Sequence, residues 1–443
     1  MDLAPAKPAT QTAPRTLDDL RISPDLVAGL LLRLLAAVGS VSGARLEQMM
    51  GVPYEVCQPI VEDYVKHNLV EMAGYAADVA PDGRPLEVRM LHVIGEAGRR
   101  RARELGELST NYLGPCPISL EDYMALATAQ ANPALDIEPA SLLQALGDLE
   151  LDEGVVEQIG SAMVSHASLF LYGAPGNGKS TITKRIVRLL GPPIEVPWAI
   201  AVGGEVIRLL DPIYHRLAGP EQPADRRFVR VLRPLVRAGG ELQYKQLDLT
   251  FDERNRYYEA PLQLKANGGL LVIDDFGRQA ESPSRLLNRF IVPMEERVDF
   301  IDLSASGHKI EIPFTCQVVF STNLQPAQLV DEAFLRRIAY KVLIPDPTAE
   351  MYARIFQREC EHNRLQVDPK AAQFLIGLYG GRPMRGSHPR QIVARLLDRA
   401  RFRREAAALT TDGLREAFNS YLNPAFSDGS PASVRSGLGS APG

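Results

Sequence analysis

Short, almost wholly apolar runs recur in the chain from residue 168 onwards, and each run ends in glycine or in polar residues. Residues 168–172 read SLFLY, residues 268–273 read GGLLVI, and residues 316–320 read CQVVF. Apolar runs of this length without alternation are typical of strands that are buried on both faces, as in a parallel sheet between two layers of helices. The pattern predicts a three-layer α/β fold for this part of the chain.

The N-terminal part of the chain has a different pattern, in which three helical segments precede two strands and a further helix. The two strands are separated by PDGR at residues 81–84, a strong turn signal. The predicted helices lie at residues 25–37, 44–50, 54–67 and 96–107, and the predicted strands at residues 69–73 and 86–93. This order resembles a winged helix-turn-helix domain, in which residues 54–67 would form the recognition helix.

The charges of this winged-helix-like segment bear on its choice of partner. Residues 21–104 contain ten basic and eleven acidic residues, and the expected recognition helix carries Glu55, Glu62 and Asp63. Acidic side chains offer a poor surface to phosphate groups. We therefore favour a protein partner for this domain. DNA binding is the alternative, and the basic cluster of Arg99, Arg100, Arg101 and Arg103 is the argument for it.

Composition and charge are those of a soluble globular protein. The chain has 443 residues, of which 45% are hydrophobic and 23% charged, and its net charge of -5 argues against a surface that coats nucleic acids. The longest apolar run, residues 26–41, is interrupted by Arg33 and is too short to cross a bilayer. The N-terminus lacks the apolar stretch of a secretory signal, and the four cysteines are widely spaced. These features predict a cytoplasmic protein with reduced thiols and no membrane association.

The first chemical motif follows directly after the run at residues 168–172. Residues 173–180 read GAPGNGKS, and helix-forming sequence follows. This is the G-x-x-x-x-G-K-[ST] pattern in a strand–loop–helix context, where backbone N–H groups and a helix N-terminus surround phosphate groups. Lys179 would reach the β- and γ-phosphates of ATP, and the Ser180 hydroxyl would bind Mg²⁺. The predicted nucleotide contacts in this segment are Gly173, Ala174, Pro175, Gly176, Asn177, Gly178, Lys179, Ser180 and Thr181.

A pair of aspartates follows the run at residues 268–273. Because α/β sheets bind ligands at the carboxyl ends of their strands, Asp274 and Asp275 are predicted to serve the same site. Asp274 would hold Mg²⁺ together with Ser180. Asp275 would polarise the attacking water as the general base.

Three further motifs follow in order, and the five together resemble AAA+ ATPases. Asn323 ends the third apolar run, DEAFLRRI covers residues 331–338, and GSHPRQI covers residues 386–392. The resemblance implies that Asn323 is the sensor-1 residue, which orients the attacking water. It also implies that Arg390 is the sensor-2 residue of a helical lid and contacts the γ-phosphate.

In AAA+ proteins a segment like residues 331–338 places an arginine in the active site of the next subunit, where its charge stabilises the transferred phosphoryl group. The resemblance implies that Arg337 is this finger, with Arg336 as the close alternative. A site completed by a neighbour requires a homo-oligomer. The family implies a ring, with six subunits as the expected number.

The resemblance extends to the segments around the acidic strand. Residues 258–269, and a predicted hairpin at residues 299–313, look like the corresponding parts of alternative-sigma-factor activators and magnesium chelatases. These are AAA+ groups with a hairpin before sensor 1. The chain departs from the sigma-factor activators because it lacks their Gly-Ala-Phe-Thr-Gly-Ala loop.

The long interval between Lys179 and Asp274 predicts an insertion. Residues 226–249 contain two strand-like halves around Ala238-Gly239-Gly240, which suggests a hairpin. The segment is strongly basic. Its arginines would either line the pore of a ring and touch a client, or pair with acidic residues of the same or the adjacent subunit.

These observations predict an ATPase that hydrolyses ATP with Mg²⁺ at inter-subunit sites and remodels a protein partner recruited by the N-terminal domain. An ATP-controlled DNA-binding switch or loader is the alternative. The predicted parts are a disordered start (1–18), a winged-helix-like domain (19–107), a linker or strap (108–149), an AAA+ core (150–345), a helical lid (346–423) and a disordered tail (424–443).

Overall fold

A computed structural model describes residues 12–76, 79, 83, 87–131, 137–304, 307–329, 335–367 and 369–422. The chain divides into two compact units. The first comprises residues 1–146, 154–172 and 180–343, and the second comprises residues 147–153, 173–179 and 344–443. The predicted disordered tail at residues 424–443, most of the predicted turn at residues 81–84 and residues 1–11 of the predicted disordered start lie outside the described residues.

The predicted disorder of residues 1–18 does not extend to the end of that segment. Arg15 and Thr16 donate their backbone N–H groups to the Asp19 carboxylate at 2.8 and 2.9 Å. The short helix η1 (Asp18–Leu20) follows, with Leu20 fully buried. The folded chain therefore begins before residue 18.

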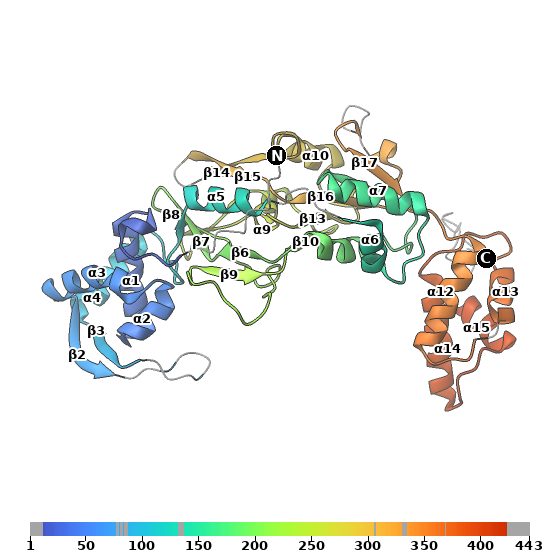
Figure 1. The fold of residues 1–443 in the computed structure, drawn as a ribbon, viewed down its shortest axis with the longest axis horizontal. Coiled ribbons are helices and arrows are strands. Elements are labelled where there is room, and N and C mark those ends of the chain that lie inside the picture. Colours follow the sequence, from blue (N-terminus) through green and yellow to red (C-terminus); the bar gives the residue numbers. More distant parts are fainter. Residues whose placement is uncertain are drawn as a thin grey trace, which may run out of the picture. The chain divides into compact units, whose positions relative to one another are not determined.

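The first unit is built around a five-stranded parallel sheet (Figure 1). Its strands lie in the order β10 (Leu235–Ala238), β13 (Leu270–Ile273), β16 (Gln317–Thr322), β5 (Leu169–Tyr172) and β17 (Tyr340–Leu343). The three apolar runs of the sequence form its three central strands, so the predicted buried parallel sheet is confirmed. Because all strands are parallel, the segments that follow β5, β13 and β16 leave the sheet at the same edge.

Aromatic side chains pack a helix against this sheet. Phe320 of β16 lies with its ring centroid 6.0 Å from that of Phe170, 5.3 Å from Phe276 and 6.1 Å from Phe290. Phe290 belongs to α10 (Pro283–Glu296), which Ser282 caps by accepting a hydrogen bond from the Arg285 N–H. All four rings are buried, and burial of this size is the main source of stability in such a core.

The N-terminal elements follow the predicted order. A three-stranded antiparallel sheet, in the order β1-β3-β2, accompanies four helices. The helices are α1 (Pro24–Val38), α2 (Gly43–Met50), α3 (Tyr54–Lys66) and α4 (Glu96–Leu108), and the strands are β1 (Ser40–Ser42), β2 (Val70–Ala76) and β3 (Arg89–Ile94). The apolar face of α1 is buried from Leu26 to Leu35, as expected of a helix at the centre of a small domain.

A second five-stranded sheet, which the sequence did not predict, lies between the N-terminal elements and the core. It mixes parallel and antiparallel pairs. Its order is β11 (Thr250–Asp252), β12 (Tyr257–Glu259), β8 (Glu205–Arg208), β7 (Ala199–Val202) and β4 (Ile118–Ser119). Ala199, Ala201 and Val206 of this sheet share one apolar cluster with the N-terminal helices.

The predicted hairpin at residues 226–249 is wrong. Its first half contains β9 (Phe228–Val231), which pairs antiparallel with β6 (Ile194–Pro197), and β10 of the core sheet. Its second half, after Gly240, contains the short helix η3 (Tyr244–Leu247) in place of a strand. Val236 and Ala238 are buried beside β13, and this burial favours pairing with β13 over a local hairpin across Gly239 and Gly240. Arg227 and Arg237 of the segment pair with acidic residues of the same chain, as in the second of the two alternatives, whereas Arg233 donates to the Gly268 carbonyl oxygen.

The predicted hairpin at residues 299–313 is confirmed, with β14 (Val298–Leu303) antiparallel to β15 (His308–Pro313). The predicted strap contains helices as well as loop. The remaining elements of the first unit are α5 (Leu120–Gln130), α6 (Pro139–Leu146), α7 (Glu153–Val164), α8 (Lys179–Ile186), η2 (Val187–Leu189), η3 (Tyr244–Leu247), α9 (Leu262–Lys265) and η4 (Pro326–Gln328).

The second unit is a helical bundle, as predicted for the lid. Its helices are α12 (Ala349–His362), α13 (Pro369–Leu378), α14 (His388–Arg403) and α15 (Thr411–Tyr421), which Figure 1 shows grouped together. Tyr352, Phe356, Tyr379 and Phe418 are buried in its core. Residues 147–153 and 173–179 cluster with this unit rather than with the sheet.

Among the described residues, no helix combines the length and the apolar character needed to span a membrane. The four cysteines are all buried and form no disulfide. Burial raises the pKa of the Cys57 thiol to about 12, which is typical of an unreactive packed cysteine.

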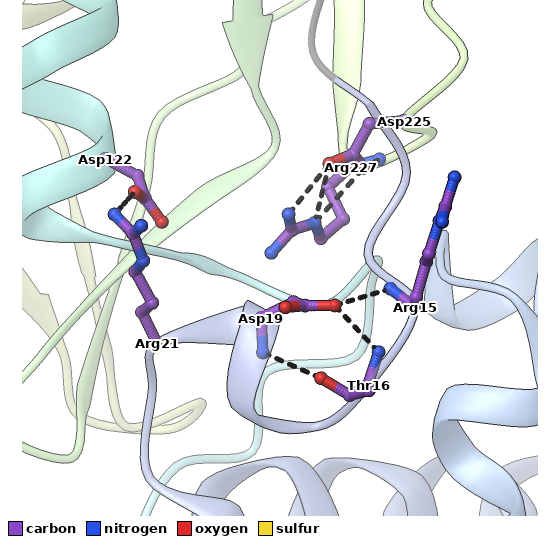
Figure 2. A network of polar contacts seen from close by, with 7 residues as sticks. All are labelled: Arg15, Thr16, Asp19, Arg21, Asp122, Asp225 and Arg227. Carbon is purple, nitrogen blue, oxygen red and sulfur yellow. Dashed lines mark hydrogen bonds and ion pairs between the residues drawn. The ribbon is translucent and has the colours of Figure 1, made fainter.

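Polar contacts, one exposed and one buried, accompany the apolar contact between the N-terminal elements and the second sheet (Figure 2). Arg21 contacts Asp122 of α5 at 3.0 Å. Arg227 and Asp225, which are 5% and 0% exposed, form a bidentate pair with contacts of 2.7 to 3.1 Å. The same loop packs against the turn between α2 and α3, because a Cβ on Gly51 would lie 3.0 Å from the Arg226 carbonyl oxygen.

Replacing Arg227 by alanine should lower the free energy of unfolding by about 3–5 kcal/mol, because it leaves the Asp225 carboxylate buried without its partner. Urea unfolding measures the loss. The double variant Asp225→Ala/Arg227→Ala should lose clearly less than Arg227→Ala alone. Equal losses in the two variants would show that the pair is not coupled.

Candidate active site

The loop after β5 has a backbone that only glycine fits at two positions. Gly173 has φ +140° and a Cβ there would lie 2.3 Å from the Ile344 carbonyl oxygen. Gly176 has φ +86° and a Cβ there would lie 2.3 Å from Ser387 Oγ. The glycines of the motif are therefore required for the shape of the loop and for its close packing against residues of the second unit.

Lys179 begins α8, and its side chain folds back over this loop. The residue is 7% exposed, and its ammonium donates to the carbonyl oxygens of Gly173 and Ala174 at 2.8 and 2.9 Å. The carbonyl oxygens of the loop thus hold the positively charged ammonium of Lys179 beside the loop, at the N-terminus of α8. This arrangement fits an anion with several oxygens, such as a phosphate chain. Thr181, the other predicted contact in α8, lies in the first turn of that helix.

Asn177 ties the loop to the lid, a role that the sequence motif does not reveal. Its side-chain N–H groups donate to the Pro345 carbonyl at 3.1 Å and to Asp346 at 2.7 Å, and its oxygen accepts the Gly386 N–H at 3.1 Å. Arg385 also pairs with Asp346. The segment just before α14 therefore contacts the loop, whereas the sensor-2 role stays a prediction. Arg390 itself is exposed on α14.

Asp274 follows β13 and collects hydrogen bonds from three segments. Its Oδ2 accepts the Ser180 hydroxyl at 3.0 Å and an Arg237 N–H at 2.6 Å, and its Oδ1 accepts the Asp275 N–H at 3.1 Å. Burial alone would raise the pKa of Asp274, but the bonds from Arg237 and Ser180 outweigh it and hold the pKa below its usual value. The predicted meeting of Ser180 with Asp274 is thus observed.

Asp275 and Asn323 are also brought together. The Asn323 amide donates to Asp275 Oδ1 at 3.4 Å, and Asp275 is exposed. Asp275 has φ +49°, a left-handed conformation that costs a non-glycine residue about 1 kcal/mol or more. Such strain is typical of functional positions, and here it places the carboxylate beside the amide of the next strand.

Gln279 supports this corner of the site, although no sequence signal marks it. It is 9% exposed, and its amide donates to the carbonyl oxygens of Gly239 and Asp274, both at 3.1 Å. It thereby links the ends of β10 and β13. A buried glutamine five residues after Asp274 is visible only once the strands are paired.

The two finger candidates lie in a segment of which residues 330–334 are outside the described part. Arg337 contacts Glu295 of α10 at 2.7 Å, and both side chains are exposed. An exposed pair of this kind contributes about 1 kcal/mol or less, so it can be exchanged for another partner. A role in a neighbouring subunit stays a prediction.

The residues around Asp274 fit a magnesium ion. A serine hydroxyl and a half-buried carboxylate with a lowered pKa are hard oxygen ligands, which Mg²⁺ prefers. Arg237 shows that a positive charge is accommodated there. Ser180 directly follows the buried ammonium of Lys179 in the chain, so the metal ligand and the phosphate-binding loop are covalently joined.

Comparisons with known proteins give one family match and several structural likenesses. A family model described as "Domain of unknown function (DUF8689)" matches residues 348–420, the region of α12 to α15. No curated protein matches the sequence. The RuvB Holliday junction branch migration motor of Thermotoga maritima is similar in structure at 14% identity and a TM-score of 0.35, over 66% of this chain and 74% of that chain. NtrX from Brucella abortus is similar at 13% identity and a TM-score of 0.40, over 73% of this chain and 62% of that chain.

The class of fold follows from the described features themselves. A parallel sheet carries a glycine-rich phosphate loop after β5, acidic residues after β13 and a polar amide after β16. The first unit therefore has an α/β fold around a parallel sheet, and the sequence that follows β5 is a P-loop motif.

The segment that contacts the loop contains a buried histidine whose charge state affects stability. His388 accepts or donates a hydrogen bond with the Tyr379 hydroxyl at 2.9 Å, and burial, with a smaller effect from Arg385, lowers the pKa of His388 to about 4. In the unfolded chain the pKa is about 6.5, so the unfolded state binds a proton first as the pH falls. Stability should therefore be lost below about pH 6.5.

Between pH 7.5 and 5.5 this effect should cost the wild-type protein about 1 kcal/mol more than it costs His388→Gln. Urea unfolding of both proteins at the two pH values measures the difference. Parallel pH dependence in the two proteins would contradict the burial of a neutral imidazole.

Proposed function

We propose that this protein hydrolyses ATP with Mg²⁺ as an AAA+ ATPase. The observation that supports this function best is a hydrogen bond of 3.0 Å from the Ser180 hydroxyl to Asp274. Ser180 is the last residue of the phosphate-binding motif, and Asp274 is the first residue after β13. This hydrogen bond joins the two motifs that nucleotide hydrolysis requires, although 94 positions separate them in the chain.

Each residue of the site has a definite task in this proposal. Lys179 and the loop amides bind the β- and γ-phosphates, and Ser180 with Asp274 holds the metal. Magnesium, when bound, supplies positive charge that offsets the charge on the phosphate oxygens. Asp275, oriented by Asn323, accepts a proton from the water whose oxygen bonds to the γ-phosphorus. The bond from that phosphorus to the β-γ bridging oxygen breaks, and ADP and phosphate leave.

Arg337 of one subunit completes the site of the next in this proposal, and Arg336 is the alternative. The exposed contact of Arg337 with Glu295 supports it, because a weakly held surface guanidinium can change partners. Composite sites require a homo-oligomer, and a closed ring, with six copies as the expected number, satisfies every site. Arg390 would add a lid contact to the γ-phosphate.

A protein client fits the N-terminal domain better than DNA. The strands β2 and β3 and their flanks expose Met72, Tyr75 and Val88 to 53%, 74% and 63%, which is costly unless a partner covers them. A pull-down with Asp275→Asn should enrich a protein. If duplex DNA instead binds with an affinity that falls steeply with salt, the DNA-binding alternative is favoured.

Asp275→Asn should bind ATP about as tightly as wild type but hydrolyse it about 10²–10⁴-fold more slowly, because the amide cannot accept the proton. Lys179→Ala should lose ATP binding. Calorimetry and phosphate release measure the two effects. Asp302→Asn is the matched control, since Asp302 lies on β14 with a side chain 74% exposed. Failure of the wild type to bind ATP with Mg²⁺ would sink the proposal.

Mixing Arg337→Ala subunits with Lys179→Ala subunits should restore part of the turnover, because some sites then combine an intact loop with an intact finger. Each variant alone should be inactive. The same mixture with Arg336→Ala in place of Arg337→Ala decides between the two arginines. If all mixtures stay inactive, the site is not shared in this way.

A further inference from the structure

Arg237 lies in a strand of the core sheet, next to the acidic segment. It is the third residue of β10 and is paired in register with Val272, two residues before Asp274. From there its guanidinium reaches Asp274 with an Nη2–Oδ2 distance of 2.6 Å. Arg237 therefore agrees with the alternative in which the arginines of this basic segment pair with acidic residues of the same chain.

The guanidinium uses the oxygen that also accepts the Ser180 hydroxyl. Oδ2 of Asp274 holds both donors, and Oδ1 holds the Asp275 N–H. The two side chains that would hold Mg²⁺ thus meet on an oxygen that already has a cationic partner. A divalent cation placed there would repel the guanidinium at short distance, so the ion and Arg237 compete for the carboxylate.

Few other interactions hold the Arg237 side chain in this position. Its Nε is buried without a hydrogen-bond acceptor among the described residues, and the side chain is 35% exposed. An unsatisfied buried N–H raises the free energy of this arrangement. The nearby Glu241 carboxylate accepts the Gly239 N–H at 2.8 Å, and its charge lies close enough to attract a displaced guanidinium.

We propose that Arg237 takes the place of magnesium when the metal is absent. It neutralises Asp274 and keeps Ser180 and Asp274 together, and it leaves the carboxylate when Mg²⁺ arrives with the nucleotide. Arg237 is thus a positioning residue that sets the magnesium requirement of the site. The inference rests on the proposed ATP and Mg²⁺ function.

The first test needs no nucleotide. In EDTA, Arg237→Ala should lower the melting temperature by about 2–4 °C, because Asp274 then lacks its cation. Adding Mg²⁺ alone should recover this loss in Arg237→Ala and should stabilise wild type much less. Arg237→Lys should behave like wild type, since it keeps the charge. Arg230→Ala is the control and should not respond to Mg²⁺, since Arg230 lies on β9, outside the core sheet, with its guanidinium 3.8 Å from Glu221.

The second test measures ATP binding by calorimetry as a function of Mg²⁺ concentration. Arg237→Ala should need about tenfold less Mg²⁺ than wild type for half-maximal binding, a change that corresponds to about 1.4 kcal/mol. Weaker binding of ATP with Mg²⁺ by Arg237→Ala would overturn the inference, because it would make Arg237 a phosphate ligand. An unchanged Mg²⁺ requirement would overturn it as well.

The two tests separate this inference from the proposed function. If wild type binds no ATP at any Mg²⁺ concentration, the proposed function fails. A double-variant cycle of Arg237→Ala and Asp274→Asn in EDTA still reports whether the two side chains are coupled. Additive shifts of the melting temperature in that cycle would show that Arg237 does not hold Asp274.

Discussion

A half-buried carboxylate at the end of a parallel strand is the constraint on which the site depends. Two donors from other segments and one from the following residue reach Asp274, and the bonds from Arg237 and Ser180 hold its pKa below the usual value in spite of its burial. Ser180 comes from the start of α8, Arg237 from the neighbouring strand, and the third donor from the following residue. The order of the strands decides which donors are available, so the sheet and the site are parts of one arrangement.

Local sequence was enough to predict the parts of the site whose geometry is local. The loop at residues 173–180 requires glycines where a Cβ would meet Ile344 or Ser387, and its flanking strand and helix are contiguous with it. Asp274 and Asp275 end an unbroken apolar run, which is visible without knowledge of its neighbours. The contact of Asp275 with Asn323 followed from the rule that parallel strands end at the same edge.

Features that depend on pairing between distant strands could not be predicted in the same way. Residues 235–238 are too few to show a period, and the glycines after them resemble a hairpin turn. Only the pairing with β13 reveals that they form the edge strand of the core. The mixed second sheet is missed for the same reason, because its strands have two to four residues each and come from widely separated segments.

The apolar cluster shared by the N-terminal helices and the second sheet has a mechanical consequence. Val206 and Ala199 are 1% exposed and belong to the same buried apolar cluster as Cys116 and Val52. A domain that shares an apolar cluster with its neighbour reorients less freely than a domain that is attached by a flexible linker. A displacement of the second sheet would therefore move α3 with it, because residues of both belong to one buried cluster. The N-terminal domain is thus better suited to move together with the second sheet than to reorient independently of it.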